Sequence, residues 1–542
     1  MHPPGQFVVG QPGVGLQLVE ELPVEVIQVI FRSQGIHAFH FTIAINDRPG
    51  MPRRPCSAGS WLLSVNPVIR NGYRSGGGGV DALPARAWRD LARRVTGVVL
   101  IDGSDGYDAA FRPAGQRFGE VRPRAVVRCR AASDVVAALD FAQHNGLPVA
   151  VRSGGHDFAG RSTTTGLLID LGELTGVSLK DGYAHIGAGT RLADVYRRLE
   201  RHARTLAAGN GPSVAIAGLT LGGGLGFLGR IWGLTCDRLV GARVVRADGS
   251  LARCDEREHA DLFWALRGGG AAGVGVVTEL SFAPVPSPRC TAVKLRWDYR
   301  YAAQVMDAWQ KWSPDAPDEL AVSLLLTVPA EPHGQARVSL FGAAAGLSPA
   351  HTDDLLNDLI ARAGARPNSR WRRQMSWTDM QATLAAHVPG GDGGHLFSRS
   401  GFFQQDIPPG PLNVLVDQLV ADRRAGESRE LDLTPWGGAY NRVPSHATAF
   451  PHRSERFLLK HTATLPPALP GTVPQESEWL RRSWETVQSW SSGGVYPNFP
   501  DPTLTDPGRT YWGDNLPRLE RVKAVHDPHG ILPGLHLRED SP

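Results

Sequence analysis

The sequence predicts an α+β protein, on three observations. Between residues 98 and 288, short apolar runs alternate with segments whose apolar residues recur at helical spacing. From about residue 291, runs that alternate apolar and polar residues resemble half-buried strands. Three prolines, at Pro284, Pro286 and Pro288, separate the two regions. We therefore expect mixed helical and sheet layers around one core, followed by a sheet-rich region.

The first region has a local signal for each element. Ser133 is a good N-cap for a helix that ends at Gly146, and Asp255 is expected to cap another helix. Apolar faces at helical spacing identify three helices, with Val135, Ala138, Leu139 and Ala142 in the first, Leu192, Val195, Tyr196 and Leu199 in the second, and Leu262, Phe263 and Leu266 in the third. Short apolar runs predict strands at residues 147–151, 167–171 and 240–245, the last closed by a turn at 247–249.

The second region alternates in the manner of half-buried strands at residues 293–297, 321–326 and 336–341. Ten of the 14 tryptophans lie beyond residue 290. Aromatic walls would suit flat rings or sugars, and ordinary core packing is the alternative for each tryptophan.

Composition excludes several classes of protein. The chain has 542 residues and a net charge of +4, too weak a charge to argue for nucleic acid. Its five scattered cysteines have neither disulfide nor zinc spacing, so no metal site is expected. No apolar run approaches the roughly 18 residues that span a bilayer, and the N-terminus lacks the pattern of a secretory signal. We therefore expect a cytoplasmic protein that needs neither a membrane nor a nucleic acid.

Residues 1–90 are expected to form a poorly ordered or loosely docked extension. A strand is possible at residues 24–31, and the glycines at 76–79 form a flexible linker by composition. His37 and His40 are closely spaced, but an ordinary pair of surface or core histidines is favoured over a metal site.

A glycine loop after a strand is the central motif. The run Val151-Arg152-Ser153-Gly154-Gly155-His156-Asp157 follows the expected strand at 147–151. Paired glycines allow close approach of a ligand and leave amide N–H groups free for phosphate oxygens. A glycine loop alone is more often a simple turn.

Two further glycine-rich motifs follow this loop in the sequence. They are Gly218-Leu219-Thr220-Leu221-Gly222-Gly223-Gly224-Leu225-Gly226 and the segment from Asp261 to Thr278 with its glycine triplet at 268–270. In this order, the three blocks resemble the FAD-binding domain of berberine-bridge-enzyme-like flavin oxidases, of the vanillyl-alcohol-oxidase type. The end of the chain, from Tyr496-Pro497-Asn498-Phe499 to Asp527, resembles the C-terminal segment of that family.

The resemblance implies a two-subdomain PCMH-type FAD-binding domain and a substrate domain with an antiparallel sheet backed by helices. It implies an FAD domain at residues 91–288, a substrate domain at 289–490 and a C-terminal segment at 491–542 that returns to the flavin. The cofactor-binding residues expected from it are Arg152, Ser153, Gly154, Gly155, His156, Asp157, Gly218, Leu219, Thr220, Gly222, Gly223, Gly224, Gly226, Val277 and Asn498.

In the family, the histidine of the glycine loop is bonded to the 8α carbon of the flavin, and here that residue is His156. An unlinked His156 packed beside the flavin is the alternative. Many relatives add a second bond from a cysteine, and the position counted back from the triplet is Gly211 here. The resemblance therefore implies a single covalent link. Cys236 lies downstream of the triplet and is expected to be a buried structural cysteine.

The catalytic base does not follow from the resemblance. Several relatives have a tyrosine where this chain has Phe499, and plant relatives have a glutamate where the spacing places Arg442. Neither residue can take a proton, although Arg442 could orient an anionic or carbonyl-rich substrate. The remaining candidates are Tyr440, Tyr496 and Asp432, and for each a structural role is the stronger alternative.

The expected function is an FAD-linked oxidoreductase that takes a hydride from an alcohol-bearing small molecule, such as a sugar or specialised metabolite, and is reoxidised by O2. A dehydrogenase with another electron acceptor and a flavin-binding protein without turnover are the alternatives. A nicotinamide enzyme is disfavoured because the glycine triplet at 222–224 fits its fingerprint badly.

Overall fold

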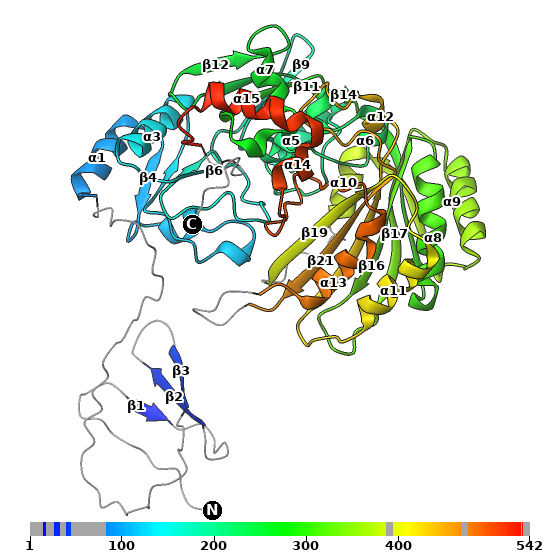
Figure 1. Cartoon of the computed structure of the whole chain (residues 1–542). Helices are drawn as coiled ribbons and strands as arrows, with labels where there is room; N and C mark the ends of the chain where they lie inside the picture. Colours follow the sequence, from blue (N-terminus) through cyan, green and yellow to red (C-terminus); the bar gives the residue numbers. More distant parts are fainter. Residues whose placement is uncertain are drawn as a thin grey trace, which may run out of the picture. The chain divides into compact units, whose positions relative to one another are not determined.

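A computed structural model describes residues 83–385, 394–467, 475–532 and 534, together with three strands near the N-terminus (Figure 1). The chain divides into two compact units, Met1–Val80 and Asp81–Pro542. The first contains an antiparallel sheet of β1 (Gly15–Gln17), β2 (Val26–Arg32) and β3 (Phe39–Ala44). Strand β2 overlaps the strand expected at 24–31. His37 and the His40 side chain lie outside the described residues, so the interpretation of that pair stays a prediction.

The second unit opens with α1 (Ala85–Arg94), which runs across the domain boundary expected at residue 90. Trp88 of α1 lies 5.1 Å from Phe141 between ring centroids, so α1 packs on α3 (Ala132–His144). The first sheet has the order β4-β5-β7-β6, and β5, β7 and β6 are parallel. Its strands are β4 (Val98–Ile101), β5 (Ala125–Arg128), β6 (Val149–Arg152) and β7 (Leu167–Asp170), which confirms the strands expected at 147–151 and 167–171.

The N-terminal ends of two helices differ from expectation. Ala131, not Ser133, is the N-cap of α3, and the Asp134 carboxylate accepts the N–H groups of Arg130 and Ala131. The Asp134 carboxylate therefore holds the residues that lead into α3, and no side chain caps the first turn of the helix. Asp255 likewise does not cap α7 (Ala260–Leu266); it accepts N–H groups within a preceding turn.

A five-stranded antiparallel sheet completes the first region, in the order β12-β11-β13-β9-β8. Its strands are β8 (Val177–Lys180), β9 (Tyr183–Gly187), β11 (Leu239–Val245), β12 (Leu251–Cys254) and β13 (Val276–Phe282). Helix α4 (Leu192–Glu200) buries the four apolar residues that predicted it. The shorter elements are α2 (Tyr107–Phe111), β10 (Arg204–Thr205), α5 (Ile216–Leu221), α6 (Gly229–Trp232) and β14 (Val285–Pro286).

A seven-stranded antiparallel sheet dominates the second region, in the order β18-β15-β17-β16-β20-β21-β19. Its strands are β15 (Arg289–Trp297), β16 (Leu320–Val328), β17 (Arg337–Ala345), β18 (Ser369–Ser376), β19 (His395–Phe403), β20 (Ser428–Pro435) and β21 (Phe457–Leu465). The three strands expected here are confirmed.

Helices cover one face of this sheet (Figure 1). They are α8 (Ala302–Trp312), α9 (Pro349–Ala363), α11 (Pro409–Val420) and α13 (Glu478–Val487). Alternate strand residues such as Val293, Leu295 and Leu324 pack into a core with these helices. The opposite side chains therefore point to the other face, which α10 (Trp377–Ala385) contacts at β15, β17 and β18.

The end of the chain returns to the first region. Helix α15 (Leu516–His526) packs against α7, and Trp512, at the end of α14 (Pro507–Trp512), donates from its indole to the Gly268 carbonyl at 3.1 Å. Helix α12 (Ala439–Arg442) follows β20 and contacts α6. Among the described residues, no helix is both long and apolar enough to cross a membrane.

Candidate active site

One cavity of about 930 Å³ joins the two regions of the second unit. Its walls come from the glycine loop after β6, the segment 209–215, α5, and strands β16, β17, β20 and β21. The C-terminal segment closes one side with residues 496–499. Three parts of the chain that are far apart in sequence therefore build a single site.

The glycine loop provides the first wall of this cavity. Gly154 packs so closely that an added Cβ would lie 2.8 Å from the Ala215 nitrogen, and Gly155 has a φ of +72°. Within the part of the chain that the structure describes, the N–H groups of Gly154, Gly155 and His156 have no hydrogen-bond partner. Free, convergent amides of this kind suit phosphate or carbonyl oxygens of a ligand.

Arg152 does not line the cavity, contrary to expectation. Its buried guanidinium forms an ion pair with Asp170 at 2.9 Å and donates to the Phe111 and Ala110 carbonyls. Arg152 therefore fixes the end of β6 against β7 and α2. Nothing in the sequence around the glycine loop indicated that the Arg152 side chain would point into the protein core and away from the cavity.

The glycine triplet forms a second wall, but only in part. Gly218, Leu219, Gly222 and Gly226 line the cavity, whereas Thr220, Gly223 and Gly224 do not. Gly223 and Gly224 adopt φ values of +117° and +86° and form a turn against Phe450 and Thr235. The Thr220 hydroxyl donates to the Ile216 carbonyl at 2.7 Å. These three residues shape the wall without facing a ligand.

Two tyrosines hold this wall in place. The Tyr496 hydroxyl accepts the N–H groups of Gly224 and Leu225 at 2.9 and 3.0 Å, and an N–H of Asn498 at 3.1 Å. The Tyr440 hydroxyl donates to the Gly226 carbonyl at 2.9 Å. Burial raises the pKa of both hydroxyls, that of Tyr496 to about 12. Both residues line the cavity, yet their hydroxyls are engaged with backbone.

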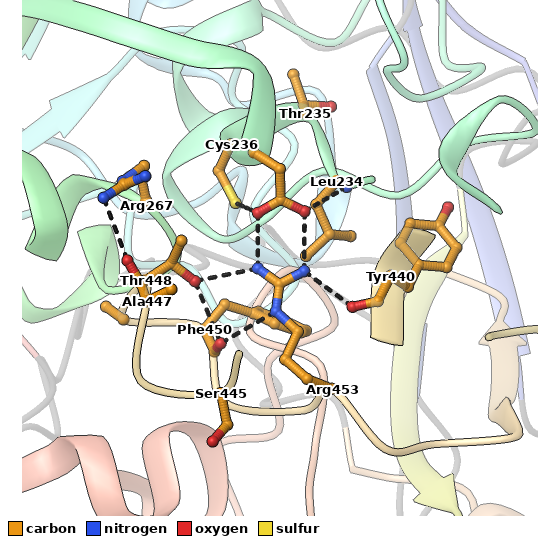
Figure 2. A network of polar contacts seen from close by, with 12 residues as sticks. Leu234, Thr235, Cys236, Arg267, Tyr440, Ser445, Ala447, Thr448, Phe450 and Arg453 are labelled. Carbon is orange, nitrogen blue, oxygen red and sulfur yellow. Dashed lines mark hydrogen bonds and ion pairs between the residues drawn. The ribbon is translucent and has the colours of Figure 1, made fainter. Parts of the chain in front are cut away.

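A buried ion pair locks the loop that carries Tyr440 (Figure 2). The Arg453 guanidinium binds both carboxylate oxygens of Asp237, at 2.7 and 2.8 Å, and donates to the carbonyls of Tyr440 and Phe450. Cys236, beside Asp237, is fully buried, as expected of a structural cysteine. The four described cysteines are all buried and none lines the cavity.

His156 faces the cavity with one ring nitrogen already engaged. Its Nε2 lies 3.1 Å from the Ser213 hydroxyl, while no described group bonds Nδ1. Burial and the charge of Arg191 lower the pKa of His156, so the imidazole is neutral. The neighbouring Asp157 accepts N–H groups of Ala159 and Arg161 and orders the loop.

A charged cluster also lines the cavity. Asp432 on β20 and Lys460 on β21 are directly paired in register, and their charged groups lie 3.5 Å apart. Glu430 lies 3.3 Å from the same ammonium. Burial and the charge of Glu430 raise the pKa of Asp432, against the opposing effect of Lys460. The ammonium of Lys460 also lies 5.1 Å from the ring centroid of Phe499, which stacks on Phe158.

Arg442, in contrast, lies outside the cavity lining. Its exposed guanidinium forms an ion pair with Asp318 at 2.7 Å and donates to the Arg230 carbonyl at 3.5 Å. A substrate-orienting role for Arg442 therefore stays a prediction, and in this structure Asp318 holds its guanidinium outside the cavity lining. Among the described residues, no tryptophan lines the cavity, and five of them are core residues: Trp309, Trp377, Trp436, Trp479 and Trp512.

The residues present fit a bound flavin nucleotide. Three buried polar atoms at the cavity wall lack a partner in the described part of the chain: Arg161 Nη1, Ser162 Oγ and Asn210 Oδ1. Val277 and Asn498 also line the cavity, as expected. Sequence reasoning missed Arg161, Ser162, Asn210, Ser213 and Lys460. The first two lie in the same loop as His156 and could have been included, but Lys460 is placed only by strand register.

The fold and this cavity define a flavin-binding oxidoreductase, and comparisons with known proteins agree. Residues 123–255 match the model described as "FAD binding domain", and residues 495–532 match the model "Berberine and berberine like". An FAD-linked oxidoreductase of Bacillus subtilis, YgaK, is 31% identical over 451 residues, which cover 81% of this chain and 96% of the relative. The chain belongs to the berberine-bridge-enzyme-like family of FAD-linked oxidoreductases.

Two oligosaccharide oxidases are also similar to this chain. Glucooligosaccharide oxidase of Sarocladium strictum is 28% identical over 461 residues, covering 80% of this chain and 90% of that protein. The structure of a chitooligosaccharide oxidase has a TM-score of 0.72 at 25% identity and covers 83% of this chain and 98% of that one. A glucooligosaccharide oxidase from Acremonium strictum, described as carrying a 6-S-cysteinyl, 8α-N1-histidyl FAD, has a TM-score of 0.73 at 25% identity, with 83% and 98% coverage.

Proposed function

We propose that this oxidoreductase oxidises a hydroxyl group of a carbohydrate or a specialised metabolite, with FAD bonded through His156 alone and O2 as the final electron acceptor. One observation carries the proposal: a single cavity is lined both by His156 with the free loop amides and by the Asp432–Lys460 pair. A residue that can hold the cofactor and a group that can accept a proton thus line the same cavity.

His156 is suited to hold the cofactor covalently. The imidazole is neutral, and its Nδ1 has no partner among the described groups, so its lone pair is available for a bond to carbon. In this proposal the Nε2–H group donates to the Ser213 hydroxyl, which leaves the lone pair on Nδ1 and fixes the ring orientation. A second bond to the flavin, from a cysteine, is not expected. Gly211 stands at the position of that cysteine, and none of the described cysteines lines the cavity.

Asp432 is the base best supported by the geometry. Of the three candidates, Tyr440 and Tyr496 bind backbone groups, whereas the Asp432 carboxylate lies at the cavity wall. Bound FAD would supply the acceptor for the hydride that leaves the substrate carbon. Asp432 would take the proton of the substrate hydroxyl, and Lys460 would hold the carboxylate in its ionised form until then.

The substrate class rests on the relatives and on the cavity. Several relatives are oligosaccharide oxidases, which supports a sugar hydroxyl as the reacting group and O2 as the acceptor. The cavity combines aromatic walls at Phe158, Phe341 and Phe499 with charged groups at one end, as a polyhydroxylated ring requires.

The test begins with acid precipitation of purified protein and of the His156→Ala variant. Yellow, fluorescent flavin should remain in the wild-type pellet and be absent from the variant pellet. Flavin released from both would refute the covalent link. Mono- and oligosaccharides are then screened for bleaching of the flavin spectrum and for O2 consumption. Bleaching without O2 uptake would indicate a dehydrogenase instead of an oxidase.

A further inference from the structure

The seven-stranded sheet has one face that its main helices do not cover. On β15, Val293, Leu295 and Trp297 point into the helical core, so Lys294 and Arg296 point to the other face. The strand register extends this face across the sheet in rows. One row pairs Trp371, Lys294, Phe341 and Ser323 in succession. The next pairs Arg296, Ser339, Leu325, Asp432 and Lys460.

This face is continuous with the active-site cavity. Phe341 and Ser323 of the first row, and Asp432 and Lys460 of the second, all line the cavity. Side chains directly opposite each other on adjacent antiparallel strands lie about 5 Å apart between Cβ atoms. Lys294 is therefore the immediate neighbour of a cavity residue, and Trp371, which is 39% exposed, lies one strand further out.

Four cations on this face lack partners. Lys294, Arg296, Arg337 and Arg373 form no ion pair or side-chain hydrogen bond with any residue that the structure describes. Partial burial and the charges of Arg296 and Arg337 lower the pKa of Lys294, and no carboxylate offsets them there. On the helix-covered side of the same edge, Arg370 and Arg372 are both paired with Asp353. Lack of a partner is thus particular to the uncovered face.

The separation between the cations and the proposed base sets the size of a ligand that reaches both. Arg296 and Asp432 belong to one row but are three strands apart. At the usual spacing of neighbouring strands, that separation is about 14 Å. A molecule with its reacting hydroxyl at Asp432 must therefore extend over several rings to touch Arg296.

We propose that Lys294, Arg296, Arg337 and Arg373 form an anion-binding subsite, and that the substrate is an acidic oligosaccharide whose carboxylates bind there while a hydroxyl at one end enters the cavity. Arginine presents a planar pair of donors that matches a carboxylate, and Trp371 offers an exposed ring face to a sugar. This inference rests on the proposed oxidation of a sugar hydroxyl, and it adds the charge and length of the sugar.

Binding to the flavin-loaded protein is measured by calorimetry with trigalacturonate and with neutral galactotriose, at 20 mM and 300 mM salt. Trigalacturonate should bind about tenfold more tightly at low salt, and high salt should remove most of that preference. The Arg296→Gln/Arg337→Gln variant should bind trigalacturonate about tenfold more weakly and leave galactotriose binding unchanged. The matched control, Arg89→Gln/Arg198→Gln, removes two exposed arginines of α1 and α4 that pair with no described side chain, and it should behave as wild type.

Equal affinity for the two trisaccharides, or equal losses in the two variants, would overturn the subsite. Tight binding of a short DNA duplex, lost in the Arg296→Gln/Arg337→Gln variant while trigalacturonate does not bind, would also overturn it and point to a nucleic acid. Calorimetry does not depend on turnover. Selective trigalacturonate binding without bleaching of the flavin would therefore support the subsite while counting against the proposed oxidation.

Discussion

Two polar contacts decide the chemistry at the level of single residues. Ser213 fixes one nitrogen of His156, and Lys460 fixes the carboxylate of Asp432. In both pairs, a residue without a reactive role orients the residue proposed to react. Each pair joins segments far apart in the sequence, at separations of 57 and 28 residues.

Ser213→Ala should lower the fraction of covalently bound flavin. Without the hydroxyl at Nε2, the imidazole can rotate or change tautomer, and Nδ1 is no longer held as the free nucleophile. We expect about a tenfold slower rise of acid-stable flavin when apoprotein is incubated with FAD, with unchanged melting temperature. Ser213→Thr, which keeps the hydroxyl, serves as the control. Equal rates for Ala and wild type would show that Ser213 has no part in the attachment.

Asp432→Asn should reduce kcat by about 10²- to 10⁴-fold, the usual contribution of a general base. In the wild type, kcat/KM should rise with pH through an apparent pKa above the ordinary aspartate value of about 3.9, because burial and Glu430 raise it. Activity appears as the carboxyl ionises, so the acidic limb falls with falling pH. Glu430→Gln removes the like charge and should move that limb to lower pH. A pH profile unaltered by Asp432→Asn would exclude Asp432 as the base.

The turn after α5 is the element that depends most on a distant partner. The positive φ values of Gly223 and Gly224 permit the turn, but its amides are satisfied by Tyr496 from the C-terminal segment. The C-terminal segment therefore completes the wall of the cavity as a structural part of it.

Tyr496→Phe should destabilise this element more than it slows the chemistry. It leaves the buried N–H groups of Gly224 and Leu225 without an acceptor, at a cost of about 1–3 kcal/mol for each buried group. A fall of several degrees in melting temperature and weaker retention of flavin should accompany less than a tenfold loss of kcat. A large loss of kcat at unchanged melting temperature would instead make Tyr496 a catalytic residue.

At the scale of the whole molecule, one buried carboxyl joins three parts of the chain. Glu455 accepts hydrogen bonds from Gln404 after β19 and from Ser492 near the start of the C-terminal segment. One of its oxygens, Oε2, has no partner among the described residues. Burial raises the pKa of Glu455 to about 7.

This raised pKa makes stability depend on pH. The folded protein holds the proton more tightly than the unfolded chain, whose glutamate pKa is about 4.3, so the associated stability is complete below that value and is lost as pH rises through about 7. At pH 8 the loss is about 3–4 kcal/mol. Glu455→Gln should raise the melting temperature at pH 8 and change it little at pH 4.5. Glu520→Gln, at an exposed site on α15, is the control and should change neither. An equal effect of Glu455→Gln at both pH values would refute the linkage.

The sequence by itself determined the family, the cofactor and the central histidine, because these depend on contiguous glycine motifs whose backbone conformation is local. It also predicted the main strands and the helical faces, since periodicity records which side of an element is buried. Helix caps were less certain, as Ser133 and Asp255 show, because several nearby polar groups compete for the same amides.

Only the tertiary structure decided which residues face the ligand. Arg152 and Arg442 turned away from the cavity because ion pairs with Asp170 and Asp318 hold them elsewhere. Strand register places Asp432 beside Lys460. It also places four cations that have no partner among the described residues on one face of the sheet. Register and packing between distant segments depend on the whole fold, and no local pattern of residues records them.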